Sequence, residues 1–244
     1  MLIYGWGWLV VTVQNSDRFL TAFNRIDHTM RDIVGMKDFI PFYRLVDQAK
    51  KRSPLVRKYE DDLRSYADLR NAIVHRRISP DYIIAEPHIQ VVEKIEHIDE
   101  VLARPKLVGQ LFRKRVMSFQ TTDSLQHTLK AIRKLKYTQF PVYNGTAFQG
   151  LVTTVGITNW LATSMAGQHF PRRTPILQDI LHHEKNEVNY KFISRYITIY
   201  EAEEIFKQGV ERGRRFEALL ITEHGKPHQK LIGIVTPIDI MKVD

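Results

Sequence analysis

The sequence contains no cysteine among its 244 residues. This absence excludes disulfide-stabilised scaffolds, thiol nucleophiles, iron–sulfur clusters and cysteine-ligated zinc sites, and it is typical of intracellular proteins. Acidic residues are also fewer than basic ones. The sequence has 27 Asp and Glu and 36 Lys and Arg, which gives a formal net charge of +9. That balance favours polyanionic partners, since each neutralised phosphate releases counterions. A basic surface that meets only solvent would give the same balance.

Long hydrophobic runs are absent as well. The apolar stretch over residues 1–13 contains no basic residue and is shorter than the about 20 apolar residues that a membrane-spanning helix needs. It also lacks the positive start and the small-residue cleavage site of a secretory signal. We therefore expect a cytoplasmic protein with no membrane partner. Four interpretations of the apolar N-terminal segment 1–15 stay open: an edge strand, a piece packed on the core, a subunit contact, or a start-site artefact.

The chain is expected to divide near residue 105 into a helical part and a mixed part. Over residues 16–105, apolar side chains recur every three or four residues, which is the spacing of amphipathic helices. The pattern predicts four helices, over residues 16–34, 39–50, 54–74 and 88–102. Asn15 or Ser16 is expected to cap the first helix and Gly35 to end it. Short connections favour an antiparallel four-helix bundle.

The second part contains a pattern of short strands and helices that occurs twice. In its first half the pattern predicts a strand from Val116, a helix over residues 125–135, and two strands, 140–143 and 150–153, joined by an Asn144-Gly145 hairpin turn, then a helix. In its second half it predicts a strand near residues 196–198, a helix over 202–210, strands over 218–222 and 231–235, and a short last helix. We therefore expect an α+β protein, in which the bundle precedes two β-α-β-β-α repeats, residues 106–166 and 167–244.

These repeats carry sequence features of a known family. Phe140-Pro141-Val142 comes before the hairpin of the first repeat, and Gly-Ile-Val-Thr-Pro-Ile-Asp-Ile occupies residues 233–240 of the second. Each feature resembles the CBS domain, named after cystathionine β-synthase. In that family two units pack as a pseudo-symmetric pair whose clefts bind adenosine-containing ligands. The resemblance implies a regulatory effector such as AMP, ADP, ATP, S-adenosylmethionine or a cyclic dinucleotide, with no cofactor required.

The same resemblance implies a set of ligand-binding residues. Asp239 would hold the ribose and Thr236 would contact the ribose or a phosphate, while Tyr137 and Thr138 would border the base. A carboxylate can accept hydrogen bonds from both ribose hydroxyls, which suits this role. Gly156 stands where the first repeat should carry its own ribose carboxylate, so only one cleft has the full set. Helix capping by Thr236 and Asp239 is the structural alternative.

The third predicted helix carries a second motif, Arg70-Asn71-x-x-x-His75. It resembles the signature of HEPN domains, named for higher eukaryotes and prokaryotes nucleotide-binding, which are helical bundles whose active members are metal-independent ribonucleases working as homodimers. An imidazole can act as general acid or base near neutral pH, and a guanidinium can stabilise phosphate charge in the transition state. The resemblance implies that Arg70, Asn71 and His75 are catalytic and that RNA is a partner.

Geometry makes dimerisation part of that hypothesis. Asn71 and His75 share a helix face, whereas Arg70 and His75 diverge by roughly 140° at 3.6 residues per turn. Two such helices related by a two-fold axis would bring both sets into one cleft, lined further by Arg64, Arg76 and Arg77. The alternative is that His75 only terminates its helix and that the bundle dimerises or docks a partner without catalysis.

Three other groups of residues have weaker patterns. The run His182-His183-Glu184 is expected to be a solvated loop or helix end rather than a metal site. Basic residues at 106 and 113–115 are expected to form a solvated linker, with contact to nucleic acid as the alternative, and Arg215 could face a ligand phosphate. Two hypotheses follow: an adenosine-nucleotide sensor that gates a ribonuclease, or a non-enzymatic nucleotide sensor.

Overall fold

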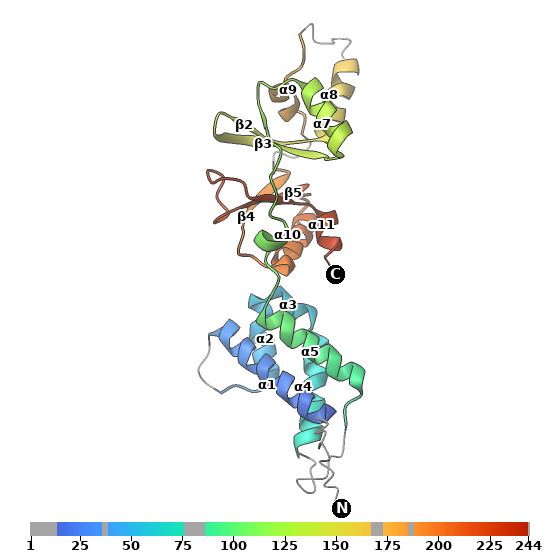
Figure 1. Ribbon diagram of the computed structural model, residues 1–244, viewed down its shortest axis with the longest axis vertical. Helices are drawn as coiled ribbons and strands as arrows, with labels where there is room; N and C mark the ends of the chain where they lie inside the picture. The colour runs from blue at the N-terminus through green and yellow to red at the C-terminus, as the bar shows by residue number, and fades with distance from the viewer. Residues whose placement is uncertain (1–13, 36–38, 76–85, 167–172, 185–187, 244) are drawn as a thin grey trace, which may run out of the picture. The chain divides into compact units, whose positions relative to one another are not determined.

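The computed structural model describes residues 14–35, 39–75, 86–166, 173–184 and 188–243 (Figure 1). Residues 1–13, for which the sequence left four interpretations open, lie outside this part of the chain. The structure divides into two compact units, Met1–Pro105 and Lys106–Asp244. Within the described residues, no helix is both long and apolar enough to cross a membrane.

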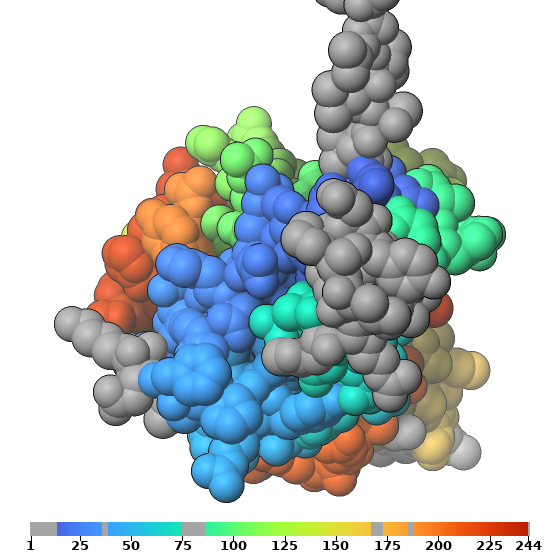
Figure 2. Space-filling model, turned by 90° about the horizontal axis from the view of Figure 1, so that it is seen from below, coloured from blue at the N-terminus to red at the C-terminus, as the bar shows by residue number. Residues whose placement is uncertain are grey.

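The first unit is helical. Its helices are α1 (Asn15–Val34), α2 (Phe42–Arg52), α3 (Pro54–Lys58), α4 (Glu60–His75) and α5 (Ile89–Ala103). Helix α1 packs against α2, α4 and α5, and the blue side chains of α1 lie next to the light-blue side chains of α2 in Figure 2. The apolar positions that predicted α1 are buried, with Phe19, Ile26 and Met30 fully enclosed. Burial of this apolar stripe is the main source of stability for such a helix.

Several helix boundaries differ from the predictions, and α2 begins at Phe42 rather than at residue 39. The third predicted helix is divided at Tyr59 into α3 and α4, and Ser53 caps α3 by accepting a hydrogen bond from the Val56 amide. At the start of α1 neither Asn15 nor Ser16 is the cap residue, which is Gln14. Glu86 instead accepts a hydrogen bond from the Ser16 amide at 3.1 Å, so a distant carboxylate satisfies that free amide. Gly35 ends α1 in the left-handed conformation, as predicted.

The second unit contains two small sheets of the same topology. The first comprises β1 (Phe119–Gln120), β2 (Gln139–Asn144) and β3 (Ala147–Thr153), and the second comprises β4 (Tyr190–Ser194), β5 (Ala218–Thr222) and β6 (Gly233–Val235). In each, the first strand pairs parallel with the second, which pairs antiparallel with the third. The helices are α6 (Val108–Leu111), α7 (Leu125–Leu135), α8 (Thr154–Ala166), α9 (Leu177–Leu181), α10 (Ile199–Glu211) and α11 (Pro237–Met241).

The first strand of the second sheet lies earlier than predicted. The prediction placed it near residues 196–198, but β4 ends at Ser194. Thr198 instead caps α10, because its side chain accepts a hydrogen bond from the Glu201 amide while Glu201 accepts one from the Thr198 amide. This reciprocal pair is a capping box. The β-branched residues at 197–199 therefore mark a helix start rather than a strand.

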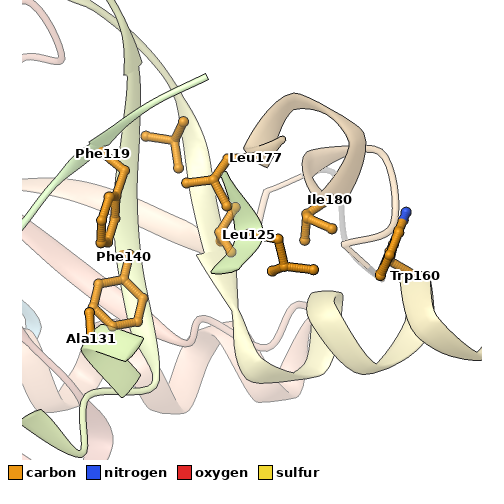
Figure 3. Packing of buried hydrophobic residues seen from close by; sticks show 9 residues of the cluster. Phe119, Leu125, Ala131, Phe140, Trp160, Leu177 and Ile180 are labelled. Carbon is orange, nitrogen blue, oxygen red and sulfur yellow. The ribbon is translucent and has the colours of Figure 1, made fainter. Parts of the chain in front are cut away.

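The two sheets exchange helices between their cores. Val108 of α6, which precedes the first sheet in the chain, packs in the core of the second sheet. Leu177 and Ile180 of α9, which follow the first sheet by more than twenty residues, pack in its core beside Leu125 and Trp160 (Figure 3). The repeat boundaries expected at 106–166 and 167–244 therefore describe the order of the strands but not the packing.

A third cluster joins the sheets to each other. Leu151 of β3 packs with Ala218, Leu220 and Ile234 of the second sheet. Phe148 contacts the ring of Phe192 edge to face, with the ring centroids 5.0 Å apart. The two repeats of the second unit therefore share a core, which fixes the elements that surround the candidate site.

Candidate functional site

The junction between β6 and α11 holds Thr236 and Asp239 in a capping box. Asp239 Oδ2 accepts hydrogen bonds from the amide and from the hydroxyl of Thr236, both at 2.9 Å. The Asp239 amide donates in return to Thr236 Oγ1. Among the described residues, none donates a hydrogen bond to Asp239 Oδ1. The structural alternative of capping is therefore present, and it leaves one carboxylate oxygen available.

A cavity of about 290 Å³ opens beside this junction. The first repeat contributes Tyr137 and Thr138 to its wall, and the second contributes Thr236 and Asp239. Lys136 adopts the left-handed conformation at the end of α7, with φ of 59°, and this turn directs the chain into the cavity wall. The other lining residues are Lys114, Arg115, Val116, Met117, Leu135, Lys136, Gln139, Ile234, Ile238 and Lys242. The structure thus places four residues predicted from sequence around one cavity.

The charge of the cavity wall was not predicted from the sequence. Lys114, Arg115, Lys136 and Lys242 line the cavity together with one carboxylate, Asp239. Lys114 and Arg115 were expected in a solvated linker, because no local pattern shows that this segment lies beside β6 and lines the same cavity as α11. Their position instead creates a basic cavity with apolar side chains on its wall, which suits an anionic ligand with an apolar ring.

The corresponding junction of the first repeat, between β3 and α8, is built differently. Thr153 has the position of Thr236, but Gly156 has no side chain to act as Asp239 does. Glu184 replaces the missing carboxylate. Its Oε1 accepts a hydrogen bond from the Thr153 amide at 2.7 Å, and its Oε2 accepts one from the Thr153 hydroxyl at 3.0 Å. A Cβ atom added to Gly156 would lie 2.0 Å from Glu184 Oε1. Glycine is therefore required for this close approach.

Both oxygens of the Glu184 carboxylate accept hydrogen bonds from other residues of the protein. Its Oε2 also accepts a hydrogen bond from Asn189 Nδ2 at 2.9 Å, and Thr153 is only 2% exposed. Burial raises the pKa of Glu184 above its ordinary value, while the hydrogen bonds from Thr153 and Asn189 act in the opposite direction. The run 182–184 was expected to be a solvated loop or helix end, and it does follow the end of α9, of which His182 is the C-cap. The Glu184 side chain is nevertheless bound inside the protein rather than solvated. The described residues hold no group of three side chains arranged to bind a metal ion.

The second sequence motif lies on α4. Arg70 Nη1 donates a hydrogen bond to Asn71 Oδ1 at 3.2 Å, and Asn71 is exposed. His75 is the last residue of α4, and its side chain lies outside the described part of the structure. Arg64, which was expected to line an RNA groove, binds Glu60 and Asp47 within the unit instead. The structure therefore places Arg70 and Asn71 together, and Arg64 acts in helix packing.

Arg215 forms an ion pair with Glu217 at 3.3 Å in the second repeat. It remains largely exposed, as does the turn at Gly213 that precedes it. Arg215 lines neither of the two cavities described in this unit. The suggestion that it faces a ligand phosphate therefore finds no support in the Thr236–Asp239 site.

The sequence matches no family model, and no curated protein matches it significantly. Several of the solved structures that resemble the chain are CBS-domain proteins. CBSX2 in complex with AMP is 15% identical, with 56% of this chain and 94% of that chain covered and a TM-score of 0.40. The CBS pair of MJ0100, solved with 5′-methylthioadenosine and S-adenosyl-L-methionine, is 15% identical over 57% and 95%, with a TM-score of 0.40. The CBS domains of a Streptococcus pneumoniae transcriptional regulator are 20% identical over 56% and 97%, with a TM-score of 0.38.

Proposed function

We propose that residues 106–244 form a sensor that binds an adenosine nucleotide in the cavity beside Thr236 and Asp239. The observation that supports this proposal is the free Asp239 Oδ1 on the wall of a cavity bounded by both repeats. This oxygen can accept hydrogen bonds from ribose hydroxyls while Oδ2 keeps its bonds to Thr236. Tyr137, Ile234 and Ile238 supply apolar surface for a base.

The cavity favours a phosphorylated ligand of modest size. Lys114, Arg115, Lys136 and Lys242 on its wall favour a ligand with negative charge, whereas S-adenosylmethionine carries a cationic sulfonium. A volume of about 290 Å³ is at the lower end of the roughly 300–1,000 Å³ of small-molecule sites. AMP, ADP and ATP therefore fit the proposal better than a cyclic dinucleotide, which carries two bases.

Thermal unfolding of the purified full chain with each ligand tests this function. AMP, ADP or ATP should raise the melting temperature, since a ligand that binds only the folded state stabilises it by mass action. Asp239→Ala should weaken binding by about tenfold or more, the equivalent of about 1.4 kcal/mol. Unphosphorylated adenosine should bind more weakly than AMP.

Glu201→Ala is a matched control for this test. Glu201 also closes a capping box, with Thr198, but it lines neither of the two cavities described for this unit. This variant should bind nucleotide as the parent chain does. If Asp239→Ala and Glu201→Ala changed the affinity equally, Asp239 would act only as a cap and the proposed site would be wrong.

The helical unit carries a second candidate function. In this function a homodimer cleaves RNA, and nucleotide binding to residues 106–244 controls the cleavage. The support for it is the resemblance of Arg70-Asn71-x-x-x-His75 to the HEPN signature, together with the pairing of Arg70 with exposed Asn71. Such gating requires that the nucleotide bind two arrangements of the protein unequally. A His75→Ala variant that retains nucleotide binding and dimerisation but loses RNA cleavage would support the enzyme. Absence of cleavage by the parent chain, with and without nucleotide, would leave a non-enzymatic sensor.

A further inference from the structure

A second, larger cavity of about 1,210 Å³ lies in the unit Lys106–Asp244. We call it the basic groove. One wall is the segment before and along β1, another is the tip of the β2–β3 hairpin, and the third is the loop between β5 and β6. The residues that line it are Arg113, Lys114, Arg115, Val116, Ser118, Gln120, Tyr143, Gly145, Thr146, Arg195, Glu223, His228, Gln229, Lys230, Leu231 and Ile232.

The groove has a strong excess of positive charge. Arg113, Lys114, Arg115 and Lys230 are exposed, and within the described residues none of them lies within ion-pair distance of a carboxylate. Glu223 is the one carboxylate in the lining, and it is already neutralised by Arg195 at 3.2 Å. Gathering like charges without partners costs stability through repulsion. A bound polyanion would remove that cost.

The walls that present these charges are held by the backbone. The Lys114 amide donates to the Ile232 carbonyl at 3.3 Å, and Arg113 forms a bridge with Gly233. A Cβ atom on Gly233 would lie 2.2 Å from the Phe112 carbonyl oxygen, so glycine allows the basic segment to lie directly against β6. These contacts fix Arg113 and Lys114 beside the start of β6, next to the loop that carries Lys230.

The lining favours recognition of phosphates rather than bases. Tyr143 is the one aromatic residue that lines the groove, and its ring packs edge to face on Phe148 with centroids 5.4 Å apart. Sequence-tolerant binding of single strands normally adds aromatic platforms on which bases stack. Apart from Glu223, the charged side chains that line the groove are lysine and arginine, and such side chains on more than one wall suit several phosphates in a row.

We propose that the basic groove binds a ligand that carries a linear chain of phosphates, held through charge without base recognition. The phosphates could belong to inorganic polyphosphate or to the backbone of a nucleic acid, since both present the same groups to the groove. This site differs from the proposed nucleotide cavity, but the two share Lys114, Arg115 and Val116.

Calorimetric titration of the full chain with inorganic polyphosphate tests the proposal, using the double variant Arg113→Ala/Lys230→Ala. Both residues line the groove and neither lines the nucleotide cavity. The double variant should lose about tenfold or more in polyphosphate affinity at moderate salt. The slope of log affinity against log salt changes by about −0.7 for each phosphate contact. Because the double variant loses two such contacts, its slope should be less steep than that of the parent chain by about 1.4.

Lys130→Ala/Arg133→Ala is the matched control, because it removes two exposed cations of α7 that line neither cavity. A control that loses as much affinity as the groove variant would overturn the proposal and leave non-specific attraction by a basic protein. A parent chain that does not bind polyphosphate at low salt would overturn it too. Single-stranded RNA with the same number of phosphates distinguishes the two sources, since RNA that binds more tightly points to nucleic acid.

The outcome can be separated from that of the proposed nucleotide site. Asp239→Ala should weaken AMP binding and leave polyphosphate affinity unchanged, while the groove variant should do the reverse. The midpoint of urea unfolding checks that each variant is folded even if no nucleotide binds. Loss of both activities in the groove variant, at an unchanged midpoint, would mean that one site serves both ligands and would contradict the proposal.

Discussion

At the β6–α11 junction the carboxylate comes from Asp239, three residues after the threonine it binds, whereas at the β3–α8 junction it comes from Glu184, which is 31 residues away from Thr153. In both places a carboxylate accepts hydrogen bonds from the amide and the hydroxyl of a threonine that follows a strand. A duplicated fold can therefore keep the same hydrogen bonds while the residue that supplies them changes.

The difference changes what each junction offers to a ligand. Asp239 has one oxygen that no described residue engages, and it lies on a cavity wall. Both oxygens of Glu184 already accept hydrogen bonds from Thr153 or Asn189, and its own side chain fills the space beside Gly156. We therefore expect one nucleotide for each chain rather than two.

The largest effect should come from giving the first junction a local carboxylate. In Gly156→Asp, the new side chain must enter space within 2.0 Å of Glu184 Oε1, and the two carboxylates would also repel each other. An unpaired buried charge costs about 3–5 kcal/mol of the free energy of unfolding. Urea unfolding followed by Trp160 fluorescence measures this loss, in a background where the other two tryptophans, Trp6 and Trp8, are phenylalanine.

Adding Glu184→Ala to that variant should restore at least half of the lost stability, because the clash partner is gone. Thr158→Asp, which puts the same charge at an exposed position of α8, serves as the control and should have little effect. A Gly156→Asp variant as stable as this control would contradict the close approach of Glu184. A nucleotide stoichiometry that rises from one to two in the double variant would show that Glu184 alone closes the first cleft.

The next largest effect should be the contrast between Glu184→Ala and Asp239→Ala. Removing the Glu184 carboxylate leaves the amide and hydroxyl of Thr153 without their acceptor, while Asn189 Nδ2 keeps only its bond to the Leu151 carbonyl. This loss costs about 2–3 kcal/mol. Asp239→Ala removes a cap from a helix with no buried residue, and such losses are about 1 kcal/mol or less. Chemical denaturation of both variants gives the comparison. Equal losses would mean that the two junctions are energetically alike.

The smallest effect should be a pH dependence specific to Glu184. Burial raises its pKa in the folded state, so the folded protein holds this proton more tightly than the unfolded chain does. The contribution of Glu184 to stability is therefore highest at low pH and falls as the pH rises from the ordinary glutamate value of about 4.3 to the raised folded value.

Glu184→Gln does not titrate, and it serves as the reference for this effect. The stability advantage of the parent chain over Glu184→Gln should be larger at pH 4 than at pH 7, as measured by urea unfolding at both values. An advantage that grows with pH would mean that the hydrogen bonds from Thr153 and Asn189 outweigh burial.

Much of the fold follows from local patterns. Helices α1, α5, α7 and α10 have strong apolar periodicity, and Asn144-Gly145 marks the β2–β3 turn, where Gly145 has a φ of 59°. The break at Tyr59 has no such signal, because apolar spacing continues across it. The start of β4 was misplaced because β-branched residues suit both a strand and the region around a helix cap.

The candidate site was predictable to the extent that its residues are close in sequence. Thr236 and Asp239 are three apart, and the spacing itself is a capping pattern. Gly156 indicated that a carboxylate was missing, but no local pattern points to Glu184 as its replacement. Likewise, the position of Lys114 and Arg115 on the cavity wall depends on pairing between Arg113 and Gly233, which only the folded chain defines.

The exchange of α6 and α9 between the two cores has a consequence for synthesis on the ribosome. The strands of the first sheet are complete at Thr153, yet Leu177 and Ile180 must emerge before its core can close. Val108 leaves the ribosome early, but its partners in the core of the second sheet, on β5 and β6, are made more than a hundred residues later. Contacts between such distant residues close slowly. A nascent chain stalled so that residues up to Ala166 have left the ribosome, but Leu177 and Ile180 have not, should therefore expose Leu125 and Trp160 to protease, although every strand of that sheet has emerged.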